Sequence, residues 1–316
     1  MPPETHTSSG ASLVAILMCT YNGEQFLAEQ LDSIKAQTHK NWKLWVSDDG
    51  SSDGTLEILK RYQAEWGEDR LMITTGPRAG STRNFLTLTA NPEIQAEGYA
   101  WADQDDVWES EKLTRSIAFL QAQSAGRPVL YGTRTLLTDA SNRPVGHSAL
   151  FIKPPSFANA LVQSIAGGNT MMFNHAARQL LAEAAVAANP IAHDWWAYQV
   201  ISGCDGLVHY DPWPSVRYRQ HGGNQIGSNL HPMARLLRLR LLLGGSFSAW
   251  LDGNLEALAV IRHRMSPQSL ATLDAFSMSR RQSLPRRLMG LYEARIHRQT
   301  FLGNAGLLLA AVLGKA

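Results

Sequence analysis

Three aspartates, Asp103, Asp105 and Asp106, lie within four positions of the stretch YAWADQDDVW, residues 99–108. Carboxylates at this spacing repel each other unless a positive charge compensates them. Mg²⁺ prefers oxygen ligands, and proteins commonly hold it with one or two carboxylates together with substrate phosphates. Asp103 and Asp105, two residues apart after an apolar stretch, therefore suit a divalent cation that carries a diphosphate. A carboxylate here can also cap the following helix, and we assign that role to Asp106.

Asp194, in the stretch HDWW at 193–196, is a second candidate for chemistry. A carboxylate within hydrogen-bond reach of a hydroxyl can take its proton during a reaction. The adjacent Trp195 and Trp196 would form an apolar wall, and desolvation by that wall would raise the pKa of the aspartate toward that of a useful base. The alternative is an aspartate at the N-cap of a helix over 192–201, with tryptophans in the core.

Apolar runs of strand length alternate with segments of helical period along the first 123 residues. We predict strands at 13–18, 42–47, 70–75 and 98–102, and helices over 26–34, 55–66, 83–90 and 109–123. This alternation predicts an α/β fold, with a mainly parallel sheet and helices on both faces.

Three polar turns, TYNG, DDGSSDG and DQDD, each follow a predicted strand. Ligands of such sheets bind beyond the carboxyl ends of the strands, so we expect the three turns to converge on one edge. Within the second turn, Gly50 and Gly54 permit tight backbone geometry. Its second half, Ser51 to Thr55, is best interpreted as a well-capped helix start.

The distribution of charge divides the chain. With 316 residues, 44% of them hydrophobic, it can bury one large core with a smaller appendage. The net charge is +2, yet residues 231–316 carry twelve basic side chains against four acids, about +8, which leaves about −6 for residues 1–230. This charge difference predicts a basic helical C-terminal region at 231–316 behind a larger domain at 13–230, which a disordered N-terminus at 1–12 precedes.

The C-terminal region repeats leucine and arginine, in MARLLRLRLLL (233–243) and again over 286–314. Cationic and apolar positions at helical spacing are typical of a helix that lies in a membrane interface. A helical subdomain packed on the main core is an equal alternative.

The expected cellular compartment is inferred from three features that the sequence lacks. The first twelve residues have no basic start or long apolar run of a signal peptide, and no segment reaches the roughly 18 apolar residues that span a bilayer. Cys19 and Cys204 form no framework of pairs, which favours a reducing compartment. We expect a cytoplasmic protein, soluble or peripheral on the cytoplasmic face of the inner membrane, with no nucleic-acid partner.

Seven stretches, in this order and spacing, resemble the family 2 glycosyltransferases, whose GT-A fold binds nucleotide sugars. They are CTYNG, SDDGSSDGT, STRN, DQDDVW, GGNTMMFN (167–174), HDWW and YRQHGGNQIG (218–227), and the likeness covers roughly residues 13 to 227. Within the family, DQDDVW, HDWW and YRQHGGN most resemble bacterial rhamnosyltransferases of polysaccharide and lipopolysaccharide assembly.

The resemblance implies roles for particular residues. The donor site would comprise Thr20, Tyr21, Asn22, Asp49, Arg83, Asp103, Gln104, Asn169 and Trp195. In these roles Asp49 would accept from the base, Tyr21 would lie on it, and Asn169 would contact sugar or acceptor hydroxyls. Simple packing is the alternative for Tyr21, a surface ion pair for Arg83, and a buried strand with a glycine turn for the segment of Asn169.

The same resemblance implies how catalysis proceeds. Asp194 matches the family's base, and the two tryptophans would stack on a sugar. Asp105 matches the metal ligand, Asp103 faces the metal or the ribose, and His221 matches a histidine that completes the metal site in some relatives. An imidazole ligand suits Mn²⁺ better than Mg²⁺.

The sequence thus predicts an inverting transferase that depends on a divalent metal, Mg²⁺ or Mn²⁺. Its donor would be dTDP-L-rhamnose, its acceptor a growing or lipid-linked glycan, and an anionic membrane surface a further partner. A UDP-hexose or UDP-N-acetylhexosamine is the alternative donor. A sugar nucleotidylyltransferase would show a glycine-rich phosphate loop with a basic residue after the first strand, where this chain has MCTYNGEQF. An inactive carbohydrate-binding relative is the fourth possibility.

Overall fold

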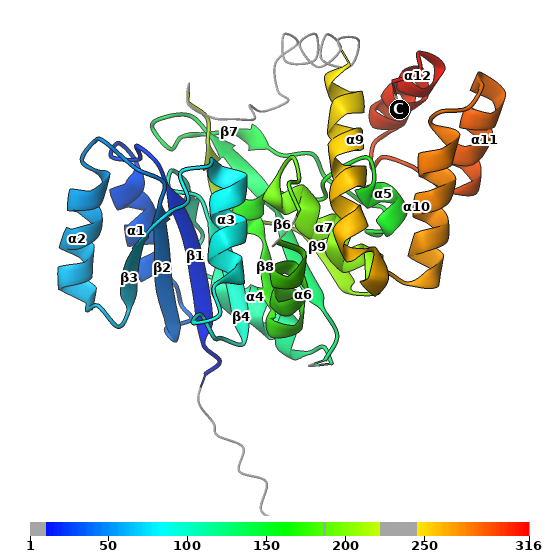
Figure 1. Cartoon of the computed structure of the whole chain (residues 1–316). Helices are drawn as coiled ribbons and strands as arrows, with labels where there is room; N and C mark the ends of the chain where they lie inside the picture. Colours follow the sequence, from blue (N-terminus) through cyan, green and yellow to red (C-terminus); the bar gives the residue numbers. More distant parts are fainter. Residues whose placement is uncertain (1–10, 125, 186–187, 222–244, 316) are drawn as a thin grey trace, which may run out of the picture.

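The first half of the sheet is parallel and carries the predicted strands. The structure, a computed structural model, describes residues 11–124, 126–185, 188–221 and 245–315 (Figure 1). Strands β1 (Val14–Thr20), β2 (Trp42–Asp48), β3 (Leu71–Thr75) and β4 (Gly98–Ala102) pair in the order β3-β2-β1-β4, all parallel. Helices α1 (Leu27–Lys35), α2 (Thr55–Trp66) and α3 (Ser81–Ala90) connect them, as the alternating pattern predicts.

The second half of the sheet is mixed. Beyond β4 lie β8 (Met172–Asn174), β6 (Val129–Thr138) and β9 (Leu207–Arg219), and β6 and β9 are parallel to each other while β8 is antiparallel to both its neighbours. The short β5 (Val107–Trp108) pairs with β9 at the edge, and β7 (Pro144–His147) pairs with β6. The acidic segment between β4 and β5 therefore crosses from the middle of the sheet to the end of β9.

Helices cover both faces, because successive side chains of a strand point to opposite sides. On one face, Val14, Ile16 and Met18 of β1 pack in a core with α1, α2 and α4 (Lys112–Gln121). On the other, Ala15 and Leu17 pack in a second core with α3, α6 (His175–Ala185) and α7 (His193–Gly203). The predicted α/β architecture is confirmed.

The C-terminal region is helical, as predicted, and packs against the second core. Its helices are α9 (Ser246–Leu258), the 3₁₀ helix η2 (Ala259–Arg264), α10 (Pro267–Ser279), α11 (Leu284–Glu293) and α12 (Phe301–Val312). They stand beside α5 (Phe157–Ala160) and α7, at the end of the molecule away from β3 (Figure 1). The leucine–arginine segment 233–243 lies outside the described residues. Within the described residues, every helix is too short or too polar to cross a bilayer.

Candidate active site

The turns after β1, β2 and β4 are tied together by hydrogen bonds, so the predicted convergence is confirmed. The backbone N–H of Tyr21 donates to the Gln104 side chain over 2.8 Å, and the Gln104 amide donates back to the Tyr21 carbonyl over 3.0 Å. The N–H of Gly23 donates to the Thr55 hydroxyl over 2.8 Å. A Cβ on Gly23 would lie 2.4 Å from the Gln104 side chain, so this contact requires glycine.

Asp48, which the sequence did not single out, organises the turn after β2. Its carboxylate accepts hydrogen bonds from the Thr20 hydroxyl at 2.8 Å, from the Ser51 hydroxyl at 2.6 Å, and from the backbone N–H groups of Ser51 and Gly50. Burial acts to raise the pKa of Asp48, but these hydrogen bonds outweigh it and lower the pKa. Asp48 therefore stays ionised and fixes the turn.

The residues expected to hold the base surround this turn. Asp49 accepts from the backbone N–H groups of Arg78 at 2.6 Å and Gly80 at 2.9 Å, which fixes the loop before α3. Asn22 has a φ of 48° and accepts from the N–H of Ser52. The Tyr21 ring is 60% exposed and can contact a ligand. Base binding by these residues stays a prediction.

Asp103 and Asp194 lie close enough to repel each other. Burial, with repulsion from Asp105 and Asp194, raises the pKa of Asp103 to about 7. Burial also raises the pKa of Asp194 to about 6, although N–H groups of Trp195 and Gly168 oppose the shift. Gly168 begins the 3₁₀ helix η1 (Gly168–Thr170), within the predicted pocket segment. The candidate base and the acidic triplet thus form one site.

Asp105 contacts His221, whose Nε2 lies 2.7 Å from a carboxylate oxygen. Within the described residues no group of three His, Cys, Asp or Glu side chains is gathered around one point. The chemistry of the donors nevertheless fits a divalent cation, since two partly buried carboxylates and an imidazole lie on neighbouring segments, and Mg²⁺ and Mn²⁺ take oxygen and imidazole ligands. Asp103, Asp105 and His221 would hold it.

The assignment of Asp106 as a helix cap is wrong. Asp106 is fully buried, and it accepts a hydrogen bond from the Asn169 amide over 2.6 Å. The residue at the N-cap of α4 is Glu111, which makes no side-chain cap. Burial and the charges of Asp103 and Asp105 raise the pKa of Asp106. Asn169 thus supports the acidic cluster, and its contact with a sugar stays a prediction.

A buried lysine accompanies Asp106. Burial lowers the pKa of Lys112 to about 7, and the charge of Asp106 opposes that shift. The ammonium group lies 4.7 Å from the centre of the Trp108 ring, a cation–π distance. The burial of this lysine could not be predicted from the sequence, because a lysine in the first turn of an amphipathic helix is normally exposed.

The predicted sugar-stacking wall is wrong for Trp196, whose side chain is fully buried in the core. Trp195 is 8% exposed, and its indole N–H donates to the Ala160 carbonyl over 2.6 Å. The N-cap of α7 is Ala192, so Asp194 lies inside the first turn. The core interpretation of the tryptophans is correct, the N-cap interpretation of Asp194 is not, and the contact of Trp195 with the donor stays a prediction.

Arg83 and Arg219 both hold parts of the site in place. Arg83 donates to the carbonyls of Ala185, at the end of α6, and Ala188, just after it, and its contact with a nucleotide stays a prediction. Arg219, at the end of β9, is 1% exposed in its side chain and pairs with Glu29. Its Nε donates to the carbonyl of Asp105 over 3.0 Å. The only sequence signal for Arg219 was its place in YRQHGGN.

His193 was also missed. Its ring stacks on Phe85 with centroids 4.2 Å apart, meets the edge of Trp101 at 4.8 Å, and burial lowers its pKa to about 3. A Cβ on Gly168 would lie 2.2 Å from His193 Nε2. His193 therefore packs closely against Gly168, whose backbone N–H donates to the Asp194 carboxylate.

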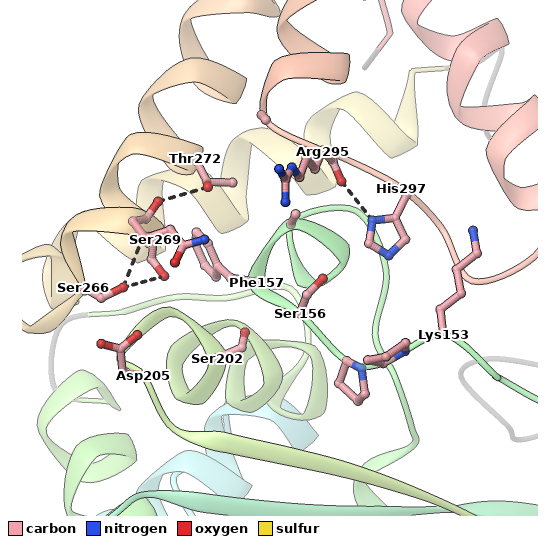
Figure 2. A pocket seen from close by; sticks show the side chains of 15 residues that line it. Lys153, Ser156, Phe157, Ser202, Asp205, Ser266, Ser269, Thr272, Arg295 and His297 are labelled. Carbon is pink, nitrogen blue, oxygen red and sulfur yellow. Dashed lines mark hydrogen bonds between the residues drawn. The ribbon is translucent and has the colours of Figure 1, made fainter.

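A cavity of about 640 Å³ lies elsewhere, at the other end of α7 (Figure 2). Lys153, Phe157, Ser202, Arg295 and His297 are among its lining residues. Ser202 is eight residues beyond Asp194, which corresponds to about 12 Å along a helix. This cavity is separate from the converging turns.

Comparisons with known proteins identify the family of this chain. The sequence model of glycosyl transferase family 2 matches residues 15–178, from β1 into α6. A dTDP-rhamnosyl transferase of Shigella flexneri, RfbG, is 27% identical over 234 residues, which cover 71% of this chain and 78% of RfbG.

Two solved structures share the fold. Staphylococcus aureus TarS residues 1–349 with UDP-GlcNAc has a TM-score of 0.54 and 16% identity, over 96% of this chain and 88% of that one. The mannosyltransferase PcManGT of Pyrobaculum calidifontis, with GDP-Man and Mn²⁺, has a TM-score of 0.51 and 16% identity, over 97% and 88%. With the family match spanning more than half of the chain, the protein belongs to glycosyl transferase family 2.

Proposed function

We propose that this protein is an inverting glycosyltransferase that moves L-rhamnose from dTDP-L-rhamnose onto a hydroxyl of a growing bacterial surface glycan such as lipopolysaccharide. The observation that carries the proposal is that Asp194 lies near enough to Asp103 for its charge to raise the pKa of that residue, which follows β4 at the edge where the three polar turns meet. A base candidate and a diphosphate-binding candidate are therefore electrostatically coupled neighbours.

In this mechanism Asp194 accepts the proton of the acceptor hydroxyl while that oxygen attacks the anomeric carbon. The bond from this carbon to the diphosphate oxygen breaks, and nucleoside diphosphate leaves. A pKa raised to about 6 leaves Asp194 ionised at neutral pH yet more basic than an exposed aspartate. The N–H groups of Trp195 and Gly168 hold its carboxylate in place.

A divalent cation held by Asp103, Asp105 and His221 would neutralise charge on the leaving diphosphate. Three neighbouring residues position these ligands. Asp106 accepts hydrogen bonds from the Asn169 amide and from the backbone N–H of Arg219, and Arg219 Nε donates to the carbonyl of Asp105.

The choice of rhamnose rests on the likeness to RfbG and on the motifs DQDDVW, HDWW and YRQHGGN. The alternative donor, a UDP-hexose or UDP-N-acetylhexosamine, is supported by the fold shared with TarS, which was solved with UDP-GlcNAc. The proposed setting is the cytoplasmic face of a membrane, where a lipid-linked glycan would be the acceptor.

The test is a thermal-shift screen of the full chain with dTDP-L-rhamnose, UDP-GlcNAc, UDP-glucose and GDP-mannose, each with Mg²⁺ or Mn²⁺. A ligand that binds only the folded state raises the melting temperature. We expect the largest rise with dTDP-L-rhamnose, followed by release of free dTDP when acceptor is added. Preference for a UDP-sugar would support the alternative donor. Release of pyrophosphate would contradict transfer altogether, and binding without turnover would identify an inactive relative.

A further inference from the structure

The exposed large apolar side chains of this protein are concentrated at one end of the chain. Among the described residues, sixteen such side chains are exposed, and ten of them lie between residues 278 and 313. We call these ten the apolar face. They are Met278, Leu284, Met289, Tyr292, Phe301, Leu302, Leu308, Leu309, Val312 and Leu313.

Helix α12 shows how this exposure arises. Leu307, Ala310 and Ala311 face the core and are buried. Phe301, Leu308 and Val312, at the spacing i, i+7 and i+11, lie on the opposite side and are 86%, 53% and 51% exposed. The helix carries no charged side chain at all. A helix that only completes a core would have polar residues on that side, as surface helices of globular proteins do.

Basic side chains accompany the apolar face. Residues 280–316 contain seven arginine and lysine residues against one acid, Glu293. Arg281 and Arg286 are exposed, and Arg286 makes only a 3.5 Å contact with Gln282 of its own segment. Within the described residues, the guanidinium groups of Arg281 and Arg295 have no hydrogen-bond or ion-pair partner. Arg280 pairs with Asp252, and Arg287 donates to the carbonyls of Ala311 and Gln282, so internal contacts account for only part of this positive charge.

We propose that the apolar face, carried by α10, α11 and α12, inserts into the interface of an anionic lipid bilayer, with nearby arginines on the headgroups. Apolar side chains supply burial in the acyl boundary, and each well-placed basic residue adds about 1 kcal/mol near an anionic leaflet. The C-terminal helices thus do both things that the sequence left as alternatives: one side packs on the core, and the other binds membrane.

Charge decides between a lipid surface and other occupants. In a dimer formed through the apolar face, the arginines of one copy would lie against the arginines of the other. Like charges across an interface repel, so they disfavour such a dimer. The segment 222–244 would meet the same repulsion, since it contains three arginines and no acid. An anionic bilayer complements both the apolar and the cationic character.

Helix α12, which carries part of the apolar face, lies at the same end of the molecule as the candidate site (Figure 1). In the view of Figure 1, α12 lies at the upper end of the molecule, the end toward which the parallel strand β1 runs from the N-terminus below. The carboxyl ends of the parallel strands, where the polar turns meet, point the same way. Membrane binding goes beyond the proposed sugar transfer and does not rest on it.

The test is co-sedimentation of the full-length protein with vesicles of phosphatidylcholine alone or mixed with phosphatidylglycerol, at low and high salt. We expect binding to the anionic vesicles and its loss as salt rises. The double variant Phe301→Ser, Leu308→Ser removes two exposed apolar side chains and should weaken the partition coefficient at least about tenfold. Arg281→Gln with Arg286→Gln should weaken binding to anionic vesicles only. Val145→Ser, an exposed apolar residue on β7, should bind as the wild type does.

Circular dichroism and melting curves establish that each variant is folded. Absence of binding to anionic vesicles at low salt would overturn the proposal, as would wild-type binding by the folded Phe301→Ser, Leu308→Ser variant. A dimer in sedimentation velocity that the same double variant dissociates would assign the face to a second copy instead. Donor binding in solution is measured separately, so failure of the sugar-transfer proposal would leave this result unaffected.

Discussion

His221 Nε2 and a carboxylate oxygen of Asp105 lie 2.7 Å apart, although 116 positions separate the two residues. The contact forms because β5 pairs with the edge of β9, which brings the segment after β4 to the end of β9. The acidic triplet is therefore completed by a residue from beyond the matched family region, which ends at residue 178.

Asp105→Ala should abolish transfer and the metal-dependent part of donor binding while the fold survives, because the side chain is partly exposed and its loss leaves no buried cavity. Thermal shift with donor, with and without Mn²⁺, measures the binding. Asp139→Ala, which removes an exposed surface ion pair with Arg143, is the matched control. Full activity of the wild type in excess chelator would remove the metal from the mechanism.

Asp194→Asn should bind the donor normally and lose turnover by about 10² to 10⁴-fold, the usual contribution of a general base. The amide keeps the shape of the carboxylate and loses its basicity, so the effect should fall on kcat. Single-turnover kinetics separate this step from product release. If the variant stays within a few-fold of the wild type, another group takes the proton.

The activity of the wild type should fall as the pH drops below about 6. Burial raises the pKa of Asp194 to about 6, so the base is ionised above that pH and protonated below it. The residual activity of Asp194→Asn should lack this limb of the profile. A wild-type profile that stays flat down to pH 4.5 would contradict the assignment.

His193→Phe should make the protein less sensitive to acid. Burial holds the pKa of His193 at about 3, whereas an unfolded histidine titrates near 6.5. The unfolded chain therefore binds the extra proton, and stability that is present above pH 6.5 is lost as the pH falls toward 3. Between pH 7.5 and 5 the wild type should lose about 2 kcal/mol more of its free energy of unfolding than the variant. Denaturant titrations measure this difference, and His147→Phe, at an exposed position, should behave as the wild type does.

The anomeric configuration should invert during transfer. A single base candidate opposite the diphosphate implies one in-line displacement, so a β-linked nucleotide donor should give an α-linked product. Proton NMR of the isolated product reports the configuration directly. Retention would require a covalent sugar intermediate and would refute the role assigned to Asp194.

The features that could be predicted from the sequence are those that depend on the local periodicity of apolar residues and on the turns between the strands. The strands from β1 to β4 and the meeting of their turns follow from periodicity and from the rule that parallel strands share an edge. The role of Asp106 could not be predicted, because its partner Asn169 is 63 positions away. The burial of Trp196 depends on how α7 packs between the sheet and the C-terminal helices. Arg219 likewise acquires its function only through contacts with Glu29 and Asp105, on two other segments.

The reach of Arg219 also has a consequence for the order of events during synthesis. Its guanidinium lies 4.5 Å from the centre of the Phe26 ring and pairs with Glu29, so it connects α1 to a strand made almost 200 residues later. Domains generally fold as units during synthesis. When β1 to β4 have been synthesised, Arg219 and His221 have not, so the segment of Asp103, Asp105 and Asp106 still lacks its contacts with these residues. Only when β9 emerges from the ribosome can the site take its final form, so a truncated product would carry the core of a transferase without its chemistry.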